Sequence, residues 1–236
     1  MELGERRTAG MTKAAWLVLI LVILALVSLV APIIRKQRGA ADCEQAMEHA
    51  LKISRMLSDF DRDYGRYPDD ETALEVKKAT GTNLTLTGSF SNDYFRQMLV
   101  SCRGAREDSF WCRTDLSPKK PDEDFSTPAK ALAAGEVGYS YIMASATRGQ
   151  KAYDDPGRPV VVAPSYKFRA DWTFDAEPWS GSKAMVLFVD GRVIPWQVRG
   201  DNRKLPCPDG KVMDDTGADT PWGTKMTPCL RAPKPR

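Results

Sequence analysis

Residues 10–38 read GMTKAAWLVLILVILALVSLVAPIIRKQR, and the 21 positions from Ala14 to Ile34 carry no charge. A helix needs about 20 residues to cross the roughly 30 Å hydrocarbon core of a bilayer. The apolar part of a secretory signal is shorter, about 7–15 residues, and ends at a cleavage site of small residues. The pair Arg6-Arg7 is not followed by the rest of a twin-arginine signal. The segment therefore predicts one membrane-spanning helix.

Basic residues lie on both sides of this predicted span. Loops rich in Lys and Arg normally stay in the cytoplasm. Here the basic residues number three on each side, so they favour neither orientation: Arg6, Arg7 and Lys13 before the span, and Arg35, Lys36 and Arg38 after it.

Cysteines bear on the compartment of the remaining chain. There is no CxxC pair and no Cys/His cluster of the kind that binds zinc. Four cysteines lie in loop-like surroundings, and neighbours in sequence would pair as Cys102–Cys112 and Cys207–Cys229, although four cysteines allow three connectivities. Disulfides persist in oxidising compartments. These pairs predict that the chain after Arg38 lies outside the cytoplasm, while Cys43 is expected to be an apolar residue on a helix face or an intermolecular bridge.

Charge is divided unevenly between the anchor and the rest. The first 39 residues hold six of the 34 Lys and Arg residues and two of the 31 acidic ones, which leaves 28 basic against 29 acidic residues beyond them. A near-neutral outer part lacks the basic patch that nucleic-acid binding requires. The length of this part suits one compact domain.

The predicted helix continues past the apolar segment. Cys43, Met47, Ala50, Leu51, Ser54 and Leu57 recur at spacings of three and four, with Ile53 and Phe60 at the margin of that stripe. Pro32 and Gly39 weaken the helix locally. We expect one helix over residues 12–64, with an apolar first half and an amphipathic second half.

Short helices and then strands follow. Gly65 and Pro68 end the long helix, and further helices are expected at 71–80, capped by Asp70 and ended by Gly81, and at 92–100. Residues 103–135 are rich in charge, Ser, Pro and Gly, which is typical of a surface loop. Strands are predicted at 137–144, 159–164 and 183–196, the last with an Asp190-Gly191 hairpin turn. This order predicts an α+β fold in which the long helix packs on a small antiparallel sheet.

The N-terminal segment resembles type IV pilins and type II secretion pseudopilins. Those proteins have a short basic leader that ends in Gly, a threonine soon after the processing site, and a proline toward the end of the apolar stretch. On this chain the leader is residues 1–10, cleavage falls between Gly10 and Met11, and Thr12 and Pro32 match. The leader motif is degenerate, because Ala15 stands where the family usually has a glutamate and Lys13 where an apolar residue is usual.

The outer part adds to the resemblance. The segments FDRDYGRYPDDETAL, SNDYFRQML, GEVGYSYI, RPVVVAP and GSKAMVLFVDGRVIPW are similar to pseudopilin-like proteins of planctomycete and verrucomicrobial bacteria, although Ser180 stands at the position of a histidine in a related signature. The resemblance implies a leader at 1–10, the helix at 11–64 and a pilin-like head at 65–199. Residues 200–236 form an extension that it does not cover.

The resemblance also implies a function. The protein would be a structural subunit, minor or accessory, of a type II secretion or type IV pilus assembly for protein transport. It would be a single-pass inner-membrane protein with a cytoplasmic N-terminus and a head in the periplasm or an extracellular filament. Its partners would be other pilin-like subunits, assembly proteins, membrane lipid and a prepilin peptidase, with methylation of the new N-terminus and no nucleic acid. Helix assembly would use Thr12, Leu17, Leu21, Leu24 and Pro32.

Two other functions remain open from the residues: an anchored interaction module that does not polymerise, and an anchored hydrolase acting on the cell wall or glycans. No cofactor motif and no catalytic motif is recognised, so we do not expect an enzyme. WSGS at 179–182 is not a nucleophile elbow, Asp190 suits a turn better than an acid catalyst, and the single histidine, His49, lacks a metal-binding partner.

The sequence also contains weaker candidates for calcium and carbohydrate sites. Asp209, Asp214 and Asp215 could bind calcium, but they lack the spaced ligands of an EF-hand loop. Exposed tryptophans could stack on carbohydrate, although core packing is their commoner role. The candidates are Trp111, Trp172, Trp179, Trp196 and Trp222.

Overall fold

The computed structural model describes residues 13–167, 170–207 and 211–236. The chain divides into two compact units, Met1–Arg38 and Gly39–Arg236. Helix α1 (Lys13–Tyr64) is continuous through Pro32 and passes from one unit into the other. The boundary between the two units falls within α1, whose second half contributes to the core of the head.

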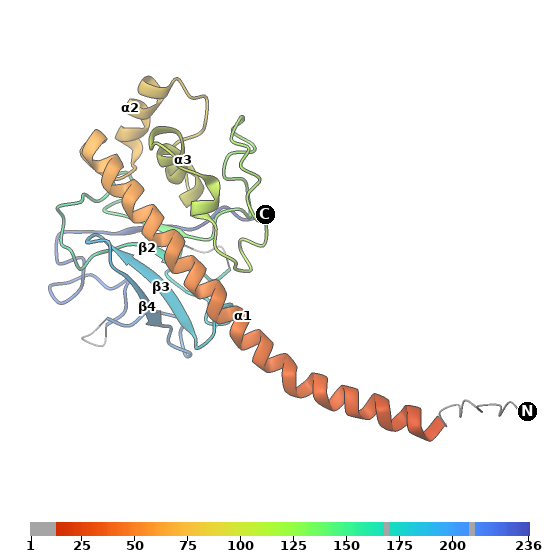
Figure 1. Cartoon of the computed structure of the whole chain (residues 1–236). Helices are drawn as coiled ribbons and strands as arrows, with labels where there is room; N and C mark the ends of the chain where they lie inside the picture. Colours follow the sequence, from red (N-terminus) through yellow and green to blue (C-terminus); the bar gives the residue numbers. More distant parts are fainter. Residues whose placement is uncertain (1–12, 168–169, 208–210) are drawn as a thin grey trace, which may run out of the picture. The chain divides into compact units, whose positions relative to one another are not determined.

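The head contains one antiparallel sheet of five strands (Figure 1). The order across the sheet is β4-β3-β2-β1-β5. The strands are β1 (Ser140–Met143), β2 (Pro159–Ala163), β3 (Lys183–Phe188), β4 (Val193–Gln197) and β5 (Cys229–Arg231). The predicted α+β class and the three predicted strand regions are confirmed, whereas β5 was not predicted.

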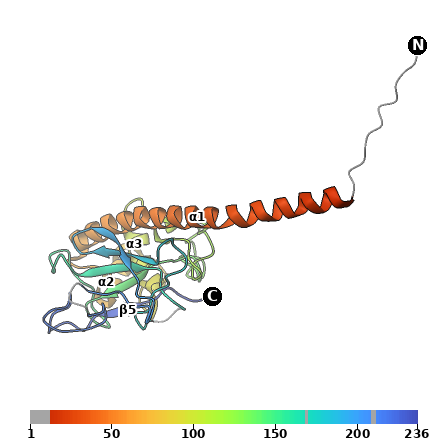
Figure 2. The same cartoon turned by 90° about the horizontal axis from the view of Figure 1, so that it is seen from below.

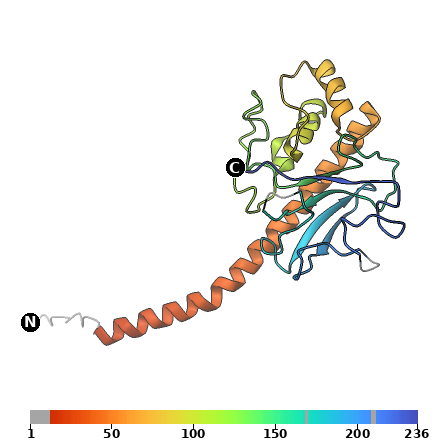
Figure 3. The same cartoon turned by 180° about the vertical axis from the view of Figure 1, so that it is seen from behind.

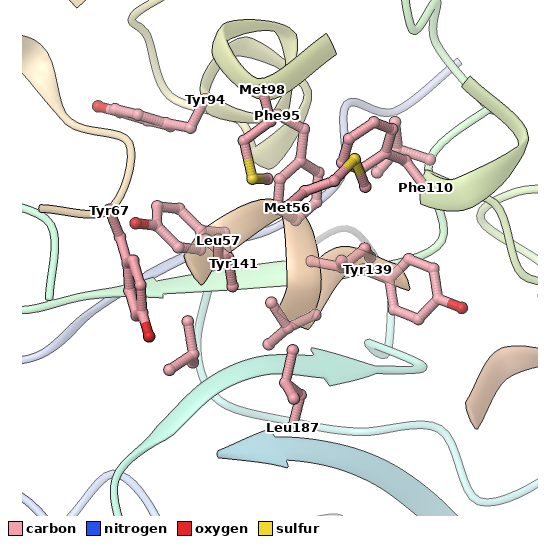
Figure 4. Packing of buried hydrophobic residues seen from close by; sticks show 14 of the residues in the cluster. Met56, Leu57, Tyr67, Tyr94, Phe95, Met98, Phe110, Tyr139, Tyr141 and Leu187 are labelled. Carbon is pink, nitrogen blue, oxygen red and sulfur yellow. The ribbon is translucent and has the colours of Figure 1, made fainter. Parts of the chain in front are cut away.

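Helix α1 from Gly39 onward covers one face of the sheet (Figure 1). Ala50, Ile53 and Phe60 are completely buried, as are Tyr139, Tyr141 and Leu187 from the sheet side of the same cluster. Figure 4 shows side chains of α1, α3 and the strands converging in this cluster. The hydroxyl of Tyr139, the residue before β1, donates to the Ala46 carbonyl oxygen of α1 at 2.8 Å.

Two shorter helices complete this layer: α2 (Asp70–Thr80) and α3 (Ser91–Ser101). Asp69, and not the predicted Asp70, caps α2, because its carboxylate accepts the backbone N–H groups of Glu71 and Thr72 at 2.9 and 2.8 Å. Gly81 ends α2 in the left-handed conformation (φ 67°) that glycine adopts without strain.

The C-terminal extension covers the opposite face of the sheet (Figure 2). Successive residues of a strand point to opposite faces, so Val186 and Phe188 of β3 join a second cluster while Leu187 joins the first. This second cluster contains Leu205, Met213, Trp222 and Leu230 from the extension, together with Trp172 and Phe174. The extension is thus an integral layer of the head and ends by adding β5.

The predicted disulfides are absent from the structure. Cys43, Cys102, Cys112 and Cys229 are free thiols, so neither Cys102–Cys112 nor Cys207–Cys229 forms. Cys112 is completely buried in the first core cluster, whereas Cys102 lies half-buried at the end of α3, with its thiol 3.5 Å from the Met56 carbonyl oxygen. Cys229 pairs with Met143 at the edge of the sheet. The cysteines that are neighbours in sequence therefore do not form disulfides with each other.

Hydrogen bonds hold the predicted surface loop at 103–135 instead of a disulfide. It contains a short 3₁₀ helix, η1 (Glu107–Phe110). The Arg96 guanidinium of α3 donates to the Ala131 carbonyl oxygen at 2.7 Å and to the Asp93 carboxylate at 2.8 Å. The Glu107 carboxylate accepts the Leu132 N–H at 2.6 Å. Buried polar groups therefore anchor both ends of this loop.

Candidate membrane anchor and assembly surface

The large apolar side chains in the first half of α1, from Trp16 to Ile34, are exposed. In the part of the chain that the structure describes, α1 is a helix that is long and apolar enough to cross a membrane, with a mean hydropathy of 3.3 in its most apolar window and no residue of that window buried. Alanine and leucine are strong helix formers, and no charge interrupts the segment between Lys13 and Arg35. The prediction of a spanning helix is therefore supported by the length and exposure of this segment.

The predicted assembly residues fall partly on this segment. Leu17, Leu21 and Leu24 each expose about 60 % of their surface. Their i, i+4 and i+7 spacing places them along one side of the helix. Pro32 is also exposed within α1. Gly10, Met11 and Thr12, the predicted processing site and its neighbour, lie outside the described residues.

Pro32 lies next to a shallow apolar hollow on the helix. Proline has no N–H, so the Ser28 carbonyl has no backbone donor one turn later. The Ser28 hydroxyl itself donates to the Ala25 carbonyl oxygen at 2.8 Å, so this hydroxyl is satisfied within the apolar segment. The hollow has a volume of about 310 Å³ and is lined by Leu26, Val27, Val30, Ala31 and Ile34. A lipid acyl chain or an apolar side chain of a neighbouring helix fits such a surface.

Gly39 begins the part of α1 that packs in the head, and sequence reasoning missed its role. It is buried, and a Cβ at this position would lie 2.9 Å from both the backbone nitrogen and the hydroxyl of Ser180. The 178–180 segment can approach the helix so closely only because residue 39 has no side chain. A glycine inside an otherwise strong helix pattern was the available signal.

The buried stripe of the second half of α1 is rotated from the predicted one. It consists of Ala46, Ala50, Ile53, Leu57 and Phe60. Leu51, which was predicted to face the core, is 43 % exposed, and Ile53 and Phe60 lie at the centre of the stripe instead of its margin. The hydrophobic pattern alone did not show which face of the helix is buried, because apolar residues occur on both the buried and the exposed face.

His49 lies on the buried side of this helix. One of its ring nitrogens, Nδ1, lies 2.7 Å from the Trp111 carbonyl oxygen, and Nε2 lies 3.7 Å from the Asp108 carboxylate. Cys43 lies nearer the start of the same helix half, and burial raises the pKa of its thiol. These contacts connect α1 to η1 and suit a structural role.

Two of the three calcium candidates, Asp214 and Asp215, lie in the described part of the chain, and Asp209 lies outside it. Asp214 pairs with the Lys204 ammonium at 2.8 Å, and Asp215 accepts the Val212 N–H at 2.9 Å. Over residues 13–167, 170–207 and 211–236, no group of three or more His, Cys, Asp and Glu side chains is placed to hold a metal ion.

Most of the tryptophan candidates are core residues. Trp111, Trp172, Trp179 and Trp222 are buried, and three of them donate their indole N–H to backbone carbonyl oxygens. Only Trp196 among the five candidates is part-exposed. Asp190 lies in the β3–β4 turn, where it accepts the Arg192 N–H at 3.0 Å, as the turn interpretation predicted.

Comparisons with known proteins add no relative. No family model matches the sequence, and no curated protein and no solved structure matches it.

Proposed function

We propose that this chain is a pilin-like subunit, of the pseudopilin type, in a type II secretion or type IV pilus assembly. Its apolar half-helix anchors it in the inner membrane, and its head lies in the periplasm or in a filament. Its partners are other pilin-like subunits and assembly proteins. It acts as a structural component and not as an enzyme.

One observation carries this proposal: α1 has two different surfaces along one uninterrupted helix. From Trp16 to Ile34 its large apolar side chains are exposed, and from Ala46 to Phe60 one stripe is buried beneath an antiparallel sheet. A membrane anchor alone does not require the helix to continue into the core of the head. A subunit whose place in a helix bundle determines where its head lies does require a helix that continues into the head.

If the apolar half of α1 moves from the bilayer into a filament, its exposed leucines have a physical role there. Between helices in a bilayer there is little hydrophobic driving force, because lipid tails are as apolar as leucine. In a filament surrounded by water, each buried Å² of apolar surface contributes about 25 cal/mol. Leu17, Leu21 and Leu24 are exposed in the single chain, so neighbouring copies could bury them.

Ala15 favours an accessory position in such an assembly. In the family the usual glutamate is thought to pair with the processed N-terminus of a neighbouring subunit. A carboxylate inside an apolar bundle is costly unless it is paired. Ala15 removes that cost. It also removes the charge pair that would fix how neighbouring subunits align along the helix axis. An anchored interaction module that does not polymerise is the second candidate, and Lys13 beside the degenerate leader favours it.

Mass spectrometry of the mature N-terminus tests the proposal. Cells expressing the full chain are fractionated, and the membrane-bound protein is digested and sequenced from its N-terminal peptide. We expect a chain that begins at an N-methylated Met11. The substitution Gly10→Val should block this processing, whereas Gly4→Val in the same leader should leave it intact. An intact Met1 leader on the wild-type chain would remove the pilin proposal and leave the non-polymerising module.

A further inference from the structure

A pocket opens on the side of the sheet that the C-terminal extension covers. Its volume is about 630 Å³, within the range typical of small-molecule sites. The β3–β4 hairpin lies at one edge of the sheet (Figure 3). Phe188, Arg192 and Trp196 of this hairpin line the pocket, and the remaining lining residues are Gly157 and residues of the extension. All of its lining residues belong to the head unit.

The hairpin wall is aromatic. Phe188 and Trp196 lie with ring centroids 5.8 Å apart, and the Arg192 guanidinium lies 5.5 Å from the centre of the Phe188 ring. Trp196 is part-exposed, and its indole N–H makes no hydrogen bond within the described part of the chain. It therefore offers an incoming molecule both an apolar ring face and a free donor.

Polar groups with spare bonding capacity surround this wall. Arg192 uses its Nε toward Asp190 and keeps its two terminal amino groups unbonded among the described residues. Asp219 contacts Lys211 through Oδ2 at 3.1 Å, so Oδ1 remains an acceptor. The Thr220 hydroxyl donates to the Gly217 carbonyl oxygen at 2.8 Å and can still accept. The pocket thus presents both donors and acceptors around an apolar ring.

We propose that this pocket binds a neutral sugar ring of a glycan. A pyranose has one face of C–H groups, which packs on an aromatic ring, and a rim of hydroxyls, which both donate and accept hydrogen bonds. Trp196 supplies the ring, Asp219 and Thr220 accept from hydroxyls, and Arg192 and the indole N–H donate to them. This inference does not depend on the proposed assembly, because it concerns only the head.

Charge favours a neutral ligand over a phosphorylated or strongly acidic one. The Arg192 guanidinium faces the pocket together with the Asp219 carboxylate, and Asp190 already contacts Arg192. Arg192 is the one cationic side chain among the lining residues, and Lys211 nearby is paired with Asp219, so a phosphate group would not meet the several convergent donors that phosphate sites provide. Sugar hydroxyls make use of both kinds of group.

Binding of tetrasaccharides to the full-length protein tests the inference. The protein is held in lipid nanodiscs and not in a glycoside detergent, which would compete for the pocket. Cellotetraose, maltotetraose and chitotetraose are titrated while tryptophan fluorescence is recorded, and calorimetry confirms any binding. We expect saturable binding of at least one of them, weakened about tenfold by Trp196→Ala through loss of the stacking surface.

Matched variants separate the pocket from the rest of the head. Ile194→Ala changes another exposed side chain of β4 outside the pocket lining and should leave binding within about twofold of wild type. Asp219→Asn should weaken binding by changing an acceptor, and it provides a second variant if Trp196→Ala fails to fold, as judged by thermal unfolding. Absence of saturable binding by all three sugars at about 10 mM, or equal binding by the Trp196→Ala and wild-type proteins, would overturn the inference.

Discussion

Glu107 is a carboxylate buried without a full set of hydrogen-bond partners. Its Oε1 accepts the Leu132 N–H, but Oε2 is buried and has no partner in the described part of the chain. Burial, together with the nearby carboxylates of Glu136, Asp122 and Glu123, raises its pKa from 4.5 to about 7, against the opposing effect of the Leu132 hydrogen bond. Near neutral pH this side chain therefore changes its charge inside the fold.

The first prediction concerns the pH dependence of stability. Because the pKa of Glu107 is higher in the folded than in the unfolded chain, its contribution to the free energy of unfolding is present below pH 4.5 and is lost as the pH rises through about 7. The loss is at most about 3 kcal/mol. Glu107→Gln should therefore have a higher free energy of unfolding than wild type at pH 8. The difference should be smaller at pH 5, as measured by urea unfolding of the full chain.

A surface carboxylate provides the control for this prediction. Glu44 is exposed on α1, so Glu44→Gln should change the free energy of unfolding little at either pH. If the stability difference between Glu107→Gln and wild type were the same at pH 5 and pH 8, the buried carboxylate would not titrate in this range.

Helix α1 is the element that sequence reasoning predicted best. Its length followed from the uncharged segment at 14–34 and from the stop at Gly65 and Pro68. The predicted buried face is rotated about the helix axis from the observed one, because Leu51 and Met47 satisfy the helical spacing as well as Ile53 does. Periodicity shows that a stripe exists, whereas the partner surface decides which of two overlapping stripes is buried.

Other elements depended on contacts between residues far apart in sequence. Strand β5 has three residues and is recognisable only through its pairing with β1, about 90 residues earlier. The role of the extension as a second layer was not predicted, because its buried Trp222 and Leu230 are isolated in a polar, proline-containing stretch. The pocket wall that includes Asp219 and Thr220 was unpredictable for the same reason.

The second prediction tests the close approach at Gly39. A branched side chain there would collide with Ser180, since even a Cβ lies 2.9 Å from its backbone nitrogen. Gly39→Val should therefore lower the free energy of unfolding by about 2 kcal/mol, a typical cost of overpacking. Ala40→Val places the same side chain on the next, exposed position of α1 and should cost only a few tenths of a kcal/mol. Equal effects of the two substitutions on urea unfolding would show that the helix does not pack closely here.

The third prediction tests the apolar half of α1 as an anchor. Arginine near the centre of a spanning helix costs about 3 kcal/mol. The double substitution Leu21→Arg with Leu24→Arg should therefore reduce the amount of chain that remains in membranes after alkaline carbonate extraction. Leu51 and Leu74 are exposed leucines of the head, on α1 and α2, and arginine at both should leave membrane retention unchanged. Full retention of the Leu21/Leu24 variant would argue that another part of the chain holds it in the membrane.

At the scale of the whole molecule, the proposed function depends on what surrounds the exposed half of α1. The head has a closed core on both faces of its sheet, whereas the large apolar side chains from Trp16 to Ile34 are not covered by any other described residue. A contiguous apolar surface of this length requires lipid or other helices around it. In the proposed assembly, neighbouring helices replace lipid around this surface.

The most direct test is photo-cross-linking between copies of the full chain in its native host. A benzophenone amino acid is placed at residue 24 on the exposed apolar segment, and separately at residue 74 on the exposed surface of α2, and the membranes are irradiated. Helix-mediated assembly predicts adducts of two and more copies of the chain from residue 24 and far fewer from residue 74. Adducts to lipid alone from residue 24, with no cross-linked copies of the chain and none to another pilin-like subunit, would contradict it.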